Sequence, residues 1–529
     1  MDEILDLRVK NRTTLLEISN LSVEYESNQR KVLSNIEFKI EKSEIILITG
    51  PTGCGKSTLI NSINGIIPNV IEAKVEGDIL FKSNKINYWD IKKRSINGIG
   101  TVFQNPESQL FALTVEEDVA FGPENFGLKR SLIQKRVDKS LNITNLENLR
   151  SRFTFNLSGG EKQKLAISGI LALKPDLILF DEPTSDLDFK GSKAIIKSIY
   201  RLAKEGNKGI ILIEHKLNDI IDIIDKVYIV ENGEIIIKGY PEDVFSKNRS
   251  IITNLGIKIP YKFDLKCEAN SDNNLNQLNN QNQEDKKLLS VSGLTFAYNE
   301  TKLFNNLDLE IIQGEFIALL GKNGSGKTTL AKLLIGLLKP NSGNIFFKGK
   351  KLNNKKVQQI ASWIGYLFQN PTHQIFKNKV YQELAFGLKN LKYKNEEISK
   401  KIEEITQILK LDDLLERDTY TLSRGQAQRV ALASVLIIKP ELIILDEPTT
   451  GQDYRNRKKI LDLSSRLNKD GISIILITHD IDLAYEYAQR IIILDAGTII
   501  LDGPPREVFK NKKLVQSAGL RIPKVMEEK

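Results

Sequence analysis

Two stretches of the sequence decide the fold: IILITGPTGCGKST at Ile45–Thr58 and FIALLGKNGSGKTT at Phe316–Thr329. Each begins with a short apolar run, typical of a strand buried on both faces, and continues into the pattern G-x-x-x-x-G-K-[ST]. Glycines in such a loop let backbone N–H groups curl around phosphates, and the helix that follows adds a favourable dipole. The sequence therefore predicts two phosphate-binding loops, each placed between a strand and a helix.

The charged and hydroxyl side chains of these loops have specific expected roles. Lys56 and Lys327 would reach the β- and γ-phosphates of a nucleotide, and Ser57 and Thr328 would hold Mg²⁺. A glycine-rich turn with a purely structural role is the alternative. Two matches in register with other repeated motifs argue against that alternative. Cys54 is interpreted as a small residue that fills the loop rather than as a redox group.

Four more motifs occur twice along the chain. The interval from the FQNP motif to the LSGGE or LSRGQ motif is the same in both copies, 54 residues from Gln104 to Ser158 and 54 from Gln369 to Ser423. This agreement indicates that one domain is present in two copies. The motifs are FQNP at Phe103–Pro106 and Phe368–Pro371, LSGGE at Leu157–Glu161 and LSRGQ at Leu422–Gln426, DEPT at Asp181–Thr184 and Asp446–Thr449, and a histidine at His215 and His479.

The repeat predicts domains at residues 14–262 and 288–525, joined by a linker at residues 263–287. Asn270–Gln283 contains seven Asn and three Gln among its fourteen residues. Such a segment cannot bury enough apolar surface to offset the entropy lost on ordering, so we expect a flexible linker. An interaction tract is the alternative interpretation of the same composition.

Each copy is expected to have an α/β fold. Apolar strands that alternate with helical periods imply a mainly parallel sheet with both faces covered. Val115–Leu149 and Val380–Leu415 carry helical periodicity and little strand signal. They are predicted to form a helical subdomain inserted between the FQNP motif and the LSGGE or LSRGQ motif.

The composition of the 529-residue chain is that of a globular protein, with 41% hydrophobic and 27% charged residues. These values exclude global disorder, a collagen-like repeat and a disulfide scaffold. Lys and Arg number 76 against 67 Asp and Glu, so the net charge is +9. That charge permits contact with nucleic acid or an anionic membrane, but no long basic run stands out. The apolar runs fall well short of the about 20 residues of a membrane-spanning helix.

Paired carboxylates end two of the apolar strands. Asp181 and Asp446 stand at the strand ends, where a carboxylate can reach Mg²⁺ directly or through water. Glu182 and Glu447 follow directly and are placed to polarise an attacking water. A helix cap or a turn carboxylate is the alternative for each residue, and the preceding phosphate-binding loop favours the catalytic interpretation.

Other polar and aromatic residues occupy equivalent places in the two copies. His215 and His479 each follow a buried strand and could contact the γ-phosphate, although a core histidine is the alternative. Gln104 and Gln369 could touch Mg²⁺ and the attacking water, at the point where the helical insert begins.

Two tyrosines lie upstream of the phosphate-binding loops. Tyr25 and Tyr298 could stack on the adenine ring of a nucleotide, and a core or surface aromatic is the alternative for both.

In this order, the motifs resemble those of the ATP-binding cassette (ABC) family, and the resemblance covers nearly the whole chain except the linker and the termini. It implies two P-loop NTPase cassettes, each with a mainly parallel sheet, an inserted helical subdomain and an N-terminal antiparallel β region. In that family two cassettes enclose two ATP molecules head to tail, so that one cassette supplies the P-loop and the other the signature motif. A tandem chain could form this sandwich within itself, and the expected cofactors are ATP and Mg²⁺.

The resemblance assigns residues to two ATPase sites. Catalytic roles fall to Glu182, His215, Glu447 and His479, and the metal would be held by Ser57, Gln104, Asp181, Thr328, Gln369 and Asp446. ATP binding in the first copy would involve Tyr25, Gly50, Pro51, Thr52, Gly53, Cys54, Gly55, Lys56, Ser57, Thr58, Gln104, Ser158, Gly159 and Gly160. In the second copy it would involve Tyr298, Gly321, Lys322, Asn323, Gly324, Ser325, Gly326, Lys327, Thr328, Thr329, Gln369, Ser423 and Gly425.

The second copy departs from the family pattern in its signature motif. Arg424 replaces the first signature glycine of the second copy, and this signature would close the site built on Lys56. A long cation there could add a phosphate contact or crowd the tip of the helix. Two hydrolytic sites of unequal rate are therefore expected.

A finer resemblance lies in Phe103–Leu128 and Phe368–Leu391, which look like the ATPases of energy-coupling-factor importers. The resemblance implies uptake of a vitamin or a transition-metal ion through an integral membrane coupling subunit and a membrane substrate-binding subunit. The ATPase would then be a peripheral protein on the cytoplasmic side of the cell membrane, with no nucleic-acid partner. A soluble tandem ABC ATPase acting on ribosomes or other nucleic-acid assemblies is the main alternative, and the ATPase pair of an exporter is another.

Overall fold

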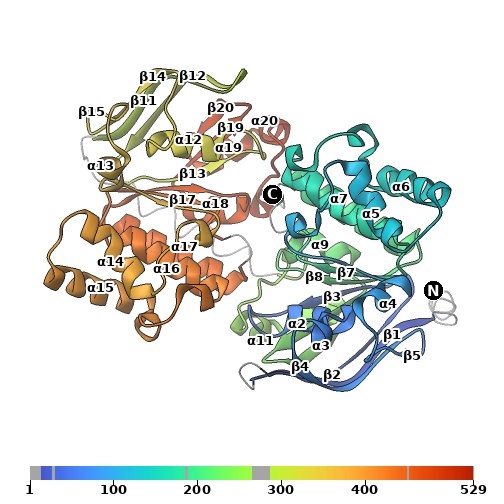
Figure 1. Ribbon diagram of the computed structural model, residues 1–529. Helices are drawn as coiled ribbons and strands as arrows, with labels where there is room; N and C mark the ends of the chain where they lie inside the picture. Colours follow the sequence, from blue (N-terminus) through green and yellow to red (C-terminus); the bar gives the residue numbers. More distant parts are fainter. Residues whose placement is uncertain are drawn as a thin grey trace. The chain divides into compact units, whose positions relative to one another are not determined.

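The structure is a computed structural model with two compact units, one formed mainly by each half of the chain (Figure 1). Most of the linker predicted at 263–287 lies outside the described residues, and the domain limits 14–262 and 288–525 stay predictions. The described residues are 13–26, 30–184, 187, 189–264, 286–449 and 452–527.

In the first unit a six-stranded sheet has the order β10-β9-β3-β8-β7-β6. All neighbouring strands pair in parallel except β10 and β9, which are antiparallel. The strands are β3 (Ile45–Thr49), β6 (Ile99–Val102), β7 (Leu177–Asp181), β8 (Gly209–Ile213), β9 (Lys226–Glu231) and β10 (Glu234–Gly239).

The central strands are apolar throughout because both faces of the sheet are covered. Alternate residues of β3 face opposite cores: Ile46 and Ile48 pack with α2 (Lys56–Asn64) and the antiparallel sheet. Ile45 and Leu47 pack in the second core, which includes residues of α8 (Phe189–Lys204).

The antiparallel sheet of the first unit has the order β2-β1-β4-β5. Its strands are β1 (Thr14–Tyr25), β2 (Arg30–Glu41), β4 (Ala73–Phe81) and β5 (Asn84–Lys85). The remaining helices around the two sheets are α3 (Ile66–Asn69), α4 (Ile91–Ile96), α9 (Leu217–Ile220), α10 (Pro241–Lys247) and α11 (Arg249–Asn254).

A helical subdomain follows the FQNP motif, as the sequence predicts. It contains α5 (Val115–Asn125), α6 (Arg130–Thr144) and α7 (Gly159–Ala172), which share a small apolar core of their own. Val119, Leu141 and Leu165 contribute to that core from the three helices. The helices therefore share a core of their own, while Ile167 and Leu171 of α7 also pack in one of the large cores of the sheet.

The second unit repeats this architecture, with a six-stranded sheet of order β16-β17-β18-β13-β19-β20 and a four-stranded sheet of order β12-β11-β14-β15. The strands are β11 (Lys287–Tyr298), β12 (Thr301–Ile312), β13 (Phe316–Leu320), β14 (Ser342–Phe347), β15 (Lys350–Lys351), β16 (Ile364–Leu367), β17 (Leu442–Asp446), β18 (Ser473–Ile477), β19 (Arg490–Asp495) and β20 (Thr498–Gly503). The helices are α12 (Lys327–Leu334), α13 (Val357–Ala361), α14 (Val380–Asn390), α15 (Asn395–Leu409), α16 (Arg424–Leu436), α17 (Tyr454–Lys469), α18 (Ile481–Tyr487), α19 (Pro505–Lys510), α20 (Lys512–Ser517) and α21 (Lys524–Glu527). The structure thus confirms the predicted fold class in both copies.

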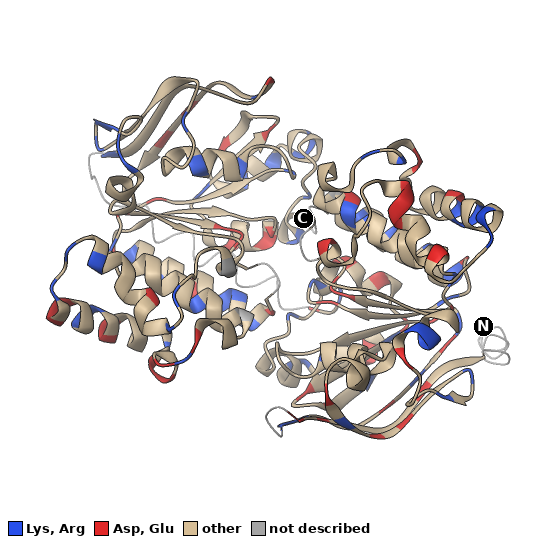
Figure 2. Cartoon of the chain, in the orientation of Figure 1, with Lys and Arg blue, Asp and Glu red and all other residues tan. Residues whose placement is uncertain are grey.

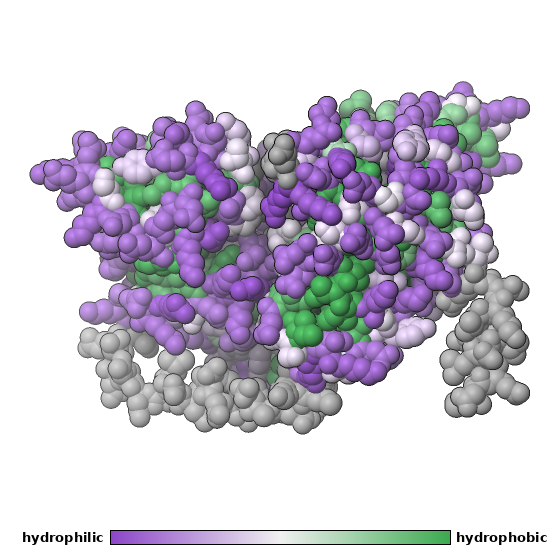
Figure 3. Space-filling view, turned by 90° about the horizontal axis from the view of Figure 1, so that it is seen from below, coloured by the Kyte–Doolittle hydropathy of each residue, from purple (hydrophilic) through white to green (hydrophobic). Residues whose placement is uncertain are grey.

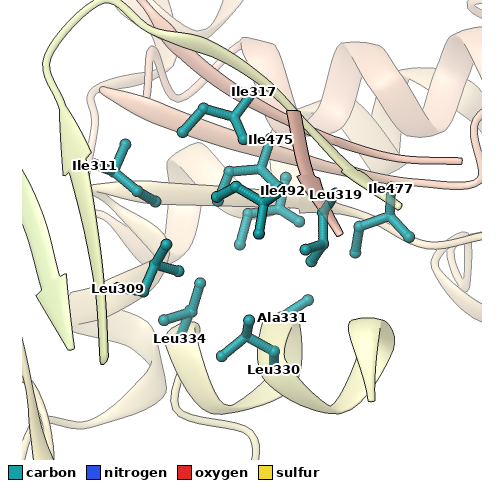
Figure 4. Close-up of a pocket in the computed structure, with 11 residues that line it drawn as sticks. Leu309, Ile311, Ile317, Leu319, Leu330, Ala331, Leu334, Ile475, Ile477 and Ile492 are labelled. Atoms are coloured by element: carbon teal, nitrogen blue, oxygen red, sulfur yellow. The ribbon is translucent and has the colours of Figure 1, made fainter. Parts of the chain in front are cut away.

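The core beneath the second P-loop contains a cavity whose lining is entirely aliphatic (Figure 4). Leu330 and Leu334 of α12 meet Leu309 of the antiparallel sheet and Ile317 of the parallel sheet around a small cavity. Because its lining offers no polar partner, such a cavity does not hold an ordered water. This packing fixes α12, and with it the loop that begins the helix.

Within the described residues, no helix combines the length and the apolar composition needed to span a bilayer. The face of the molecule in Figure 3 is mostly hydrophilic, with separate hydrophobic patches.

Candidate functional site

The first P-loop connects β3 to α2 through a backbone that only glycine adopts easily. Gly55 precedes α2 with φ of 107°, and Gly53 has φ of 81°. A Cβ added at Gly53 would meet nothing within 4 Å, so the loop is open on that side. The second P-loop repeats the geometry, with φ of 79° at Gly324 and 108° at Gly326. Both loops therefore have the open concave backbone that a phosphate chain requires.

The lysine of each P-loop folds back over its own loop. Lys56 Nζ donates hydrogen bonds to the carbonyl oxygens of Gly50 at 2.9 Å and Pro51 at 2.8 Å. Lys327 Nζ donates to the carbonyl oxygen of Gly321 at 2.8 Å in the same way. Neutral carbonyls satisfy an ammonium less well than an anion does, so a phosphate can replace them. The positions of the two lysines therefore fit the binding of a nucleoside triphosphate.

The P-loop hydroxyl and the strand-end aspartate meet in both copies. Ser57 hydrogen-bonds Asp181, and Thr328 hydrogen-bonds Asp446. Asp446 Oδ1 is buried and has no hydrogen-bond partner among the described residues. A hydroxyl beside a carboxylate with a spare oxygen fits Mg²⁺. Two of the three predicted metal residues therefore meet in each copy, whereas the hydrogen bond described for Gln104 goes to Glu182.

Among the described residues, no three His, Cys, Asp or Glu side chains converge as ligands of a metal ion. Mg²⁺ does not need such a cage, because it keeps several waters and binds one or two protein ligands together with substrate phosphates.

Burial and the neighbouring Glu182 raise the pKa of Asp181 to about 6, despite the opposing hydrogen bond from Ser57. The proton therefore stays on the folded-state carboxyl group to a higher pH than in the unfolded chain. Burial likewise raises the pKa of Asp446, against hydrogen bonds from Tyr366 and Thr328. In the ligand-free protein both aspartates are held in surroundings that disfavour their charge, which a bound cation would offset.

Asp181→Asn is expected to raise the stability of the ligand-free protein at pH 7. A folded-state pKa of about 6 against an ordinary value of 3.8 means that stability falls as pH rises from about 4 to about 6. The loss amounts to at most about 3 kcal/mol, since one pKa unit is about 1.4 kcal/mol. Melting temperatures measured from pH 4 to 8 in EDTA should show Asp181→Asn above the wild type at pH 7 and level with it near pH 4.

Asp176, which directly precedes β7 at the opposite end of the strand from Asp181, is a control whose pKa is shifted in the opposite direction. Burial raises its pKa, but the hydrogen bond and charge of Lys82 outweigh burial and lower the pKa overall. Asp176→Asn should therefore lower the melting temperature at pH 7. A stability gain for Asp181→Asn that does not change with pH would contradict the explanation.

The glutamate that follows each strand end is fixed from several sides. Glu182 and Glu447 both have φ of 48°, a left-handed conformation that is uncommon for glutamate and typical of functional sites. The backbone N–H of Glu182 donates to the carbonyl oxygen of Ile213 at 3.0 Å, and that of Glu447 donates to Ile477 at 2.9 Å. The backbone of each glutamate is therefore held in place by the end of the neighbouring strand, β8 or β18.

The predicted histidines and one predicted glutamine reach these glutamates. His215 Nε2 lies 3.2 Å from Glu182 Oε1, and Gln104 Nε2 donates to Glu182 Oε2 at 2.9 Å. His479 Nε2 lies 3.3 Å from Glu447 Oε1. The structure thus assembles Gln, Glu and His in the first copy and Glu and His in the second, at the carboxyl ends of the parallel strands.

Both predicted tyrosines touch the start of the P-loop helix. Tyr25 and Thr58 share a hydrogen bond between their hydroxyls at 3.0 Å, and Tyr298 and Thr329 share one at 3.4 Å. Each contact ties the antiparallel sheet to the helix that begins with the P-loop lysine.

The signature residues lie in the helical subdomain of each unit, whereas the P-loop lies in the sheet core. Ser158 caps α7 and forms a capping box with Glu161, and Ser423 caps α16 in the same way with Gln426. A Cβ added at Gly159 would meet nothing within 4 Å, so the helix end is open. The same is true at Gly425 and, apart from one contact at 3.7 Å, at Gly160.

One buried carboxylate near the first site is absent from the sequence prediction. Glu214 accepts hydrogen bonds from the backbone N–H groups of Thr184 at 3.1 Å and His215 at 2.9 Å, and also from the Thr184 hydroxyl. Glu214, which directly follows β8, therefore connects the end of that strand to the loop after Glu182. Comparison of the copies gives the only sequence signal, since Thr478 occupies the equivalent place.

Tyr366 is a second functional candidate that the sequence reasoning missed. Its hydroxyl donates to Asp446 Oδ2 at 2.7 Å. Burial and the adjacent Asp446 carboxylate raise the pKa of the phenol, so it remains a donor at any physiological pH. The equivalent residue of the first copy is Thr101.

The profile of the ABC transporter family matches residues 33–185 and 304–450, which together exceed half of the chain. A Methanosarcina mazei protein named as an ABC transporter ATP-binding protein is 39% identical, and the alignment covers 96% of this chain and 92% of the relative. A similarly named Caldanaerobacter subterraneus protein is 36% identical over 96% of this chain and 95% of its own length. A solved structure of cbiO1 from Clostridium perfringens, described as part of the ABC transporter complex cbiONQ, is 36% identical with a TM-score of 0.41. It covers 46% of this chain and 99% of its own.

Two phosphate-binding cassettes with P-loop, signature and strand-end motifs define an ATP-binding protein. The chain belongs to the ABC transporter family. It is an ATPase, and its cassettes bind ATP, normally together with Mg²⁺.

Proposed function

We propose that this chain couples ATP hydrolysis to the uptake of a small solute, a vitamin or a transition-metal ion, through separate membrane subunits of energy-coupling-factor type. The chain would act as a peripheral protein on the cytoplasmic side of the cell membrane. The observation that carries the proposal is the pair of equivalent exposed aromatic contacts that follow the Gln-bearing loop in the two copies.

These contacts lie on the segments whose sequence resembles the importers. Phe111 stacks on Phe121 with ring centroids 5.5 Å apart, and Phe111 is 70% exposed. At the equivalent place, Phe376 packs edge-on against Phe386 at 4.7 Å and is 59% exposed. Large exposed aromatics at matching positions are typical of a protein interface.

In each copy a buried carboxylate holds the backbone of the exposed phenylalanine, Phe111 or Phe376, in place. Asp118 Oδ1 accepts from the backbone N–H groups of Phe111 at 2.8 Å and Ala112 at 3.0 Å. Glu383 Oε2 accepts from the N–H of Phe376 at 3.1 Å in the second copy. Since Gln104 and Gln369 lie a few residues upstream, a partner seated on the aromatics would sense the state of the nucleotide site.

The integral membrane coupling subunit is the proposed partner that binds at the exposed side chains of Phe111 and Phe376. A membrane substrate-binding subunit selects the solute. Acidic and basic residues are interspersed on α15 and over both units (Figure 2), and the basic runs are short. That distribution supports a protein partner over the alternative of ribosomes or other nucleic-acid assemblies, which favour a basic face.

Within each cassette the residues have separate proposed tasks. Lys56 and Lys327 hold the β- and γ-phosphates, and the histidines hold the γ-phosphate. Glu182 or Glu447 accepts a proton from the attacking water. Mg²⁺, when bound, would supply positive charge that offsets the charge developing on the phosphates.

The other predicted site residues serve the same two sites in this proposal. Ser57 and Asp181, and Thr328 and Asp446, hold the metal with the two glutamines. The signature residues Ser158, Gly159 and Gly160 close the site of the second P-loop, and Ser423 and Gly425 close the site of the first. The sandwich forms within one chain.

The double variant Phe111→Ala/Phe376→Ala is expected to keep ATP binding and basal ATPase activity but to lose its membrane partners. The tagged chain, purified from detergent-solubilised membranes of its own cells, should bring down integral membrane proteins and a bound small molecule. The double variant should recover less than about a tenth of them, because aromatic anchors dominate such interfaces.

Tyr88→Ala is the matched control, because Tyr88 is 91% exposed but lies between β5 and α4, away from the helical subdomain. It should recover the partners as the wild type does. Recovery of the wild type with ribosomes, and without integral membrane proteins, would overturn the importer proposal.

A further inference from the structure

A tyrosine supports the strand-end aspartate in the second copy. Tyr366 lies on β16, whose backbone pairs in parallel with β17, and its Cα is opposite Ile444. Its hydroxyl crosses toward the end of β17 and donates to Asp446 Oδ2 at 2.7 Å. Tyr366 is 9% exposed and Asp446 is 3% exposed, so water hardly competes for the bond.

The two oxygens of Asp446 are used differently. Oδ2 accepts from the phenol, whereas Oδ1 is buried without a hydrogen-bond partner among the described residues. A carboxylate pinned through one oxygen presents the other in a fixed direction. Thr328, the P-loop hydroxyl residue, is beside the same carboxylate, so the spare oxygen and the hydroxyl belong to one site.

In the first copy a shorter side chain stands at the equivalent place. Thr101 occupies the same place on β6, opposite Leu179 of β7. A threonine hydroxyl is attached at Cβ and does not extend across the neighbouring strand as a phenol does. The neighbours that act on Asp181 are Glu182, Ser57, Lys56 and His215. The two sites therefore differ in what orients their aspartate.

We propose that Tyr366 is a positioning residue for the divalent cation of the second site, so that the second site holds the cation more tightly than the first. The inference rests on the proposed nucleotide sites. Partners that orient a metal ligand typically account for 10- to 100-fold in metal affinity.

The test is a titration of the full chain with Mn²⁺ in the presence of ADP, with free Mn²⁺ followed by electron paramagnetic resonance. No turnover is required. The wild type is expected to bind two Mn²⁺ ions with distinct affinities. Tyr366→Phe removes only a hydroxyl and should weaken the tighter ion about 10-fold, leaving the other unchanged.

Tyr487→Phe is the matched control. Tyr487 OH donates to Asp462 Oδ1 at the same distance of 2.7 Å, between α18 and α17 of the same unit. It should leave both Mn²⁺ affinities unchanged. In the Lys327→Ala background, which removes the second site, Tyr366→Phe should no longer have an effect.

Unchanged Mn²⁺ binding in Tyr366→Phe would overturn the inference while leaving the proposed sites intact. Equal weakening in Tyr487→Phe would also overturn it, since the effect would not depend on Asp446. A wild type that binds ADP and no Mn²⁺ would instead contradict the proposed metal sites themselves.

Discussion

Glu182→Gln is expected to lower the ATPase turnover of the first site by about 10²- to 10³-fold while leaving ATP binding intact. Glutamine keeps the shape of the side chain but cannot take a proton from water, and a general base contributes about 10²–10⁴-fold. His215 Nε2 lies 3.2 Å from Glu182, and Gln104 donates to it at 2.9 Å, so the side chain is already held in position. Steady-state phosphate release and equilibrium binding of ATP measure the two quantities separately.

Glu447→Gln is the corresponding change in the second site, and the two losses are expected to be unequal. The first site is closed in our proposal by the signature that contains Arg424, whereas the second is closed by LSGGE. Glu441→Gln is the control, because Glu441 directly precedes β17, at the opposite end of the strand from Glu447, and pairs with Lys348. Identical losses from Glu182→Gln and Glu447→Gln would remove the asymmetry, and full activity in either would refute its catalytic role.

Lys56→Ala and Lys327→Ala are each expected to abolish nucleotide binding at one site. Lys56 Nζ donates to two loop carbonyls and to Cys54 Sγ, and Lys327 Nζ donates to two carbonyls of its own loop. Charge-assisted bonds to phosphate contribute about 1.5–3 kcal/mol each, so losing two of them weakens binding by roughly 10²- to 10⁴-fold. Calorimetric titration with ADP and Mg²⁺ should fall from two nucleotides per chain to one in either variant and to none in the double variant.

Lys82→Ala is the control for that experiment. Lys82 donates to the carbonyl oxygen of Asn97 and pairs with Asp176, so it lies in the first cassette but outside the P-loop. It should bind two nucleotides. Two nucleotides bound by Lys56→Ala would contradict the assignment of the first site.

Local motifs predicted the strand, loop and helix around each P-loop because their chemistry is local. A backbone that wraps phosphates needs glycine at particular positions, and Gly53 and Gly55 do have left-handed conformations. Likewise, the apolar runs of β3 and β13 predicted strands covered on both faces, and their residues do pack in two cores.

Contacts between strands were not predictable in the same way. Tyr366 and Asp446 are 80 residues apart and meet only because β16 pairs with β17. Glu214 reaches Thr184 across the neighbouring strand ends for the same reason. A lone Tyr in an apolar strand, or a Glu before a histidine, carries no local signal. Only the differences between copies, Thr101 against Tyr366 and Glu214 against Thr478, single these positions out.

The carboxylate and histidine pairs could be predicted from the sequence only in part. The sequence placed Glu182 and His215 at two strand ends, and parallel strands bring such ends to one edge of a sheet. The left-handed conformation of Glu182 and its backbone bond to Ile213 depend on the neighbouring strand, so they required the structure.

The central claim is that a single chain contains two complete ATP sites that it closes by itself. Native mass spectrometry of the Glu182→Gln/Glu447→Gln chain, incubated with ATP and Mg²⁺ and passed through a desalting column, tests this claim most directly. We predict a monomer that retains two ATP molecules. Retention of none or of one, or of two ATP molecules per chain only after two chains associate, would contradict it.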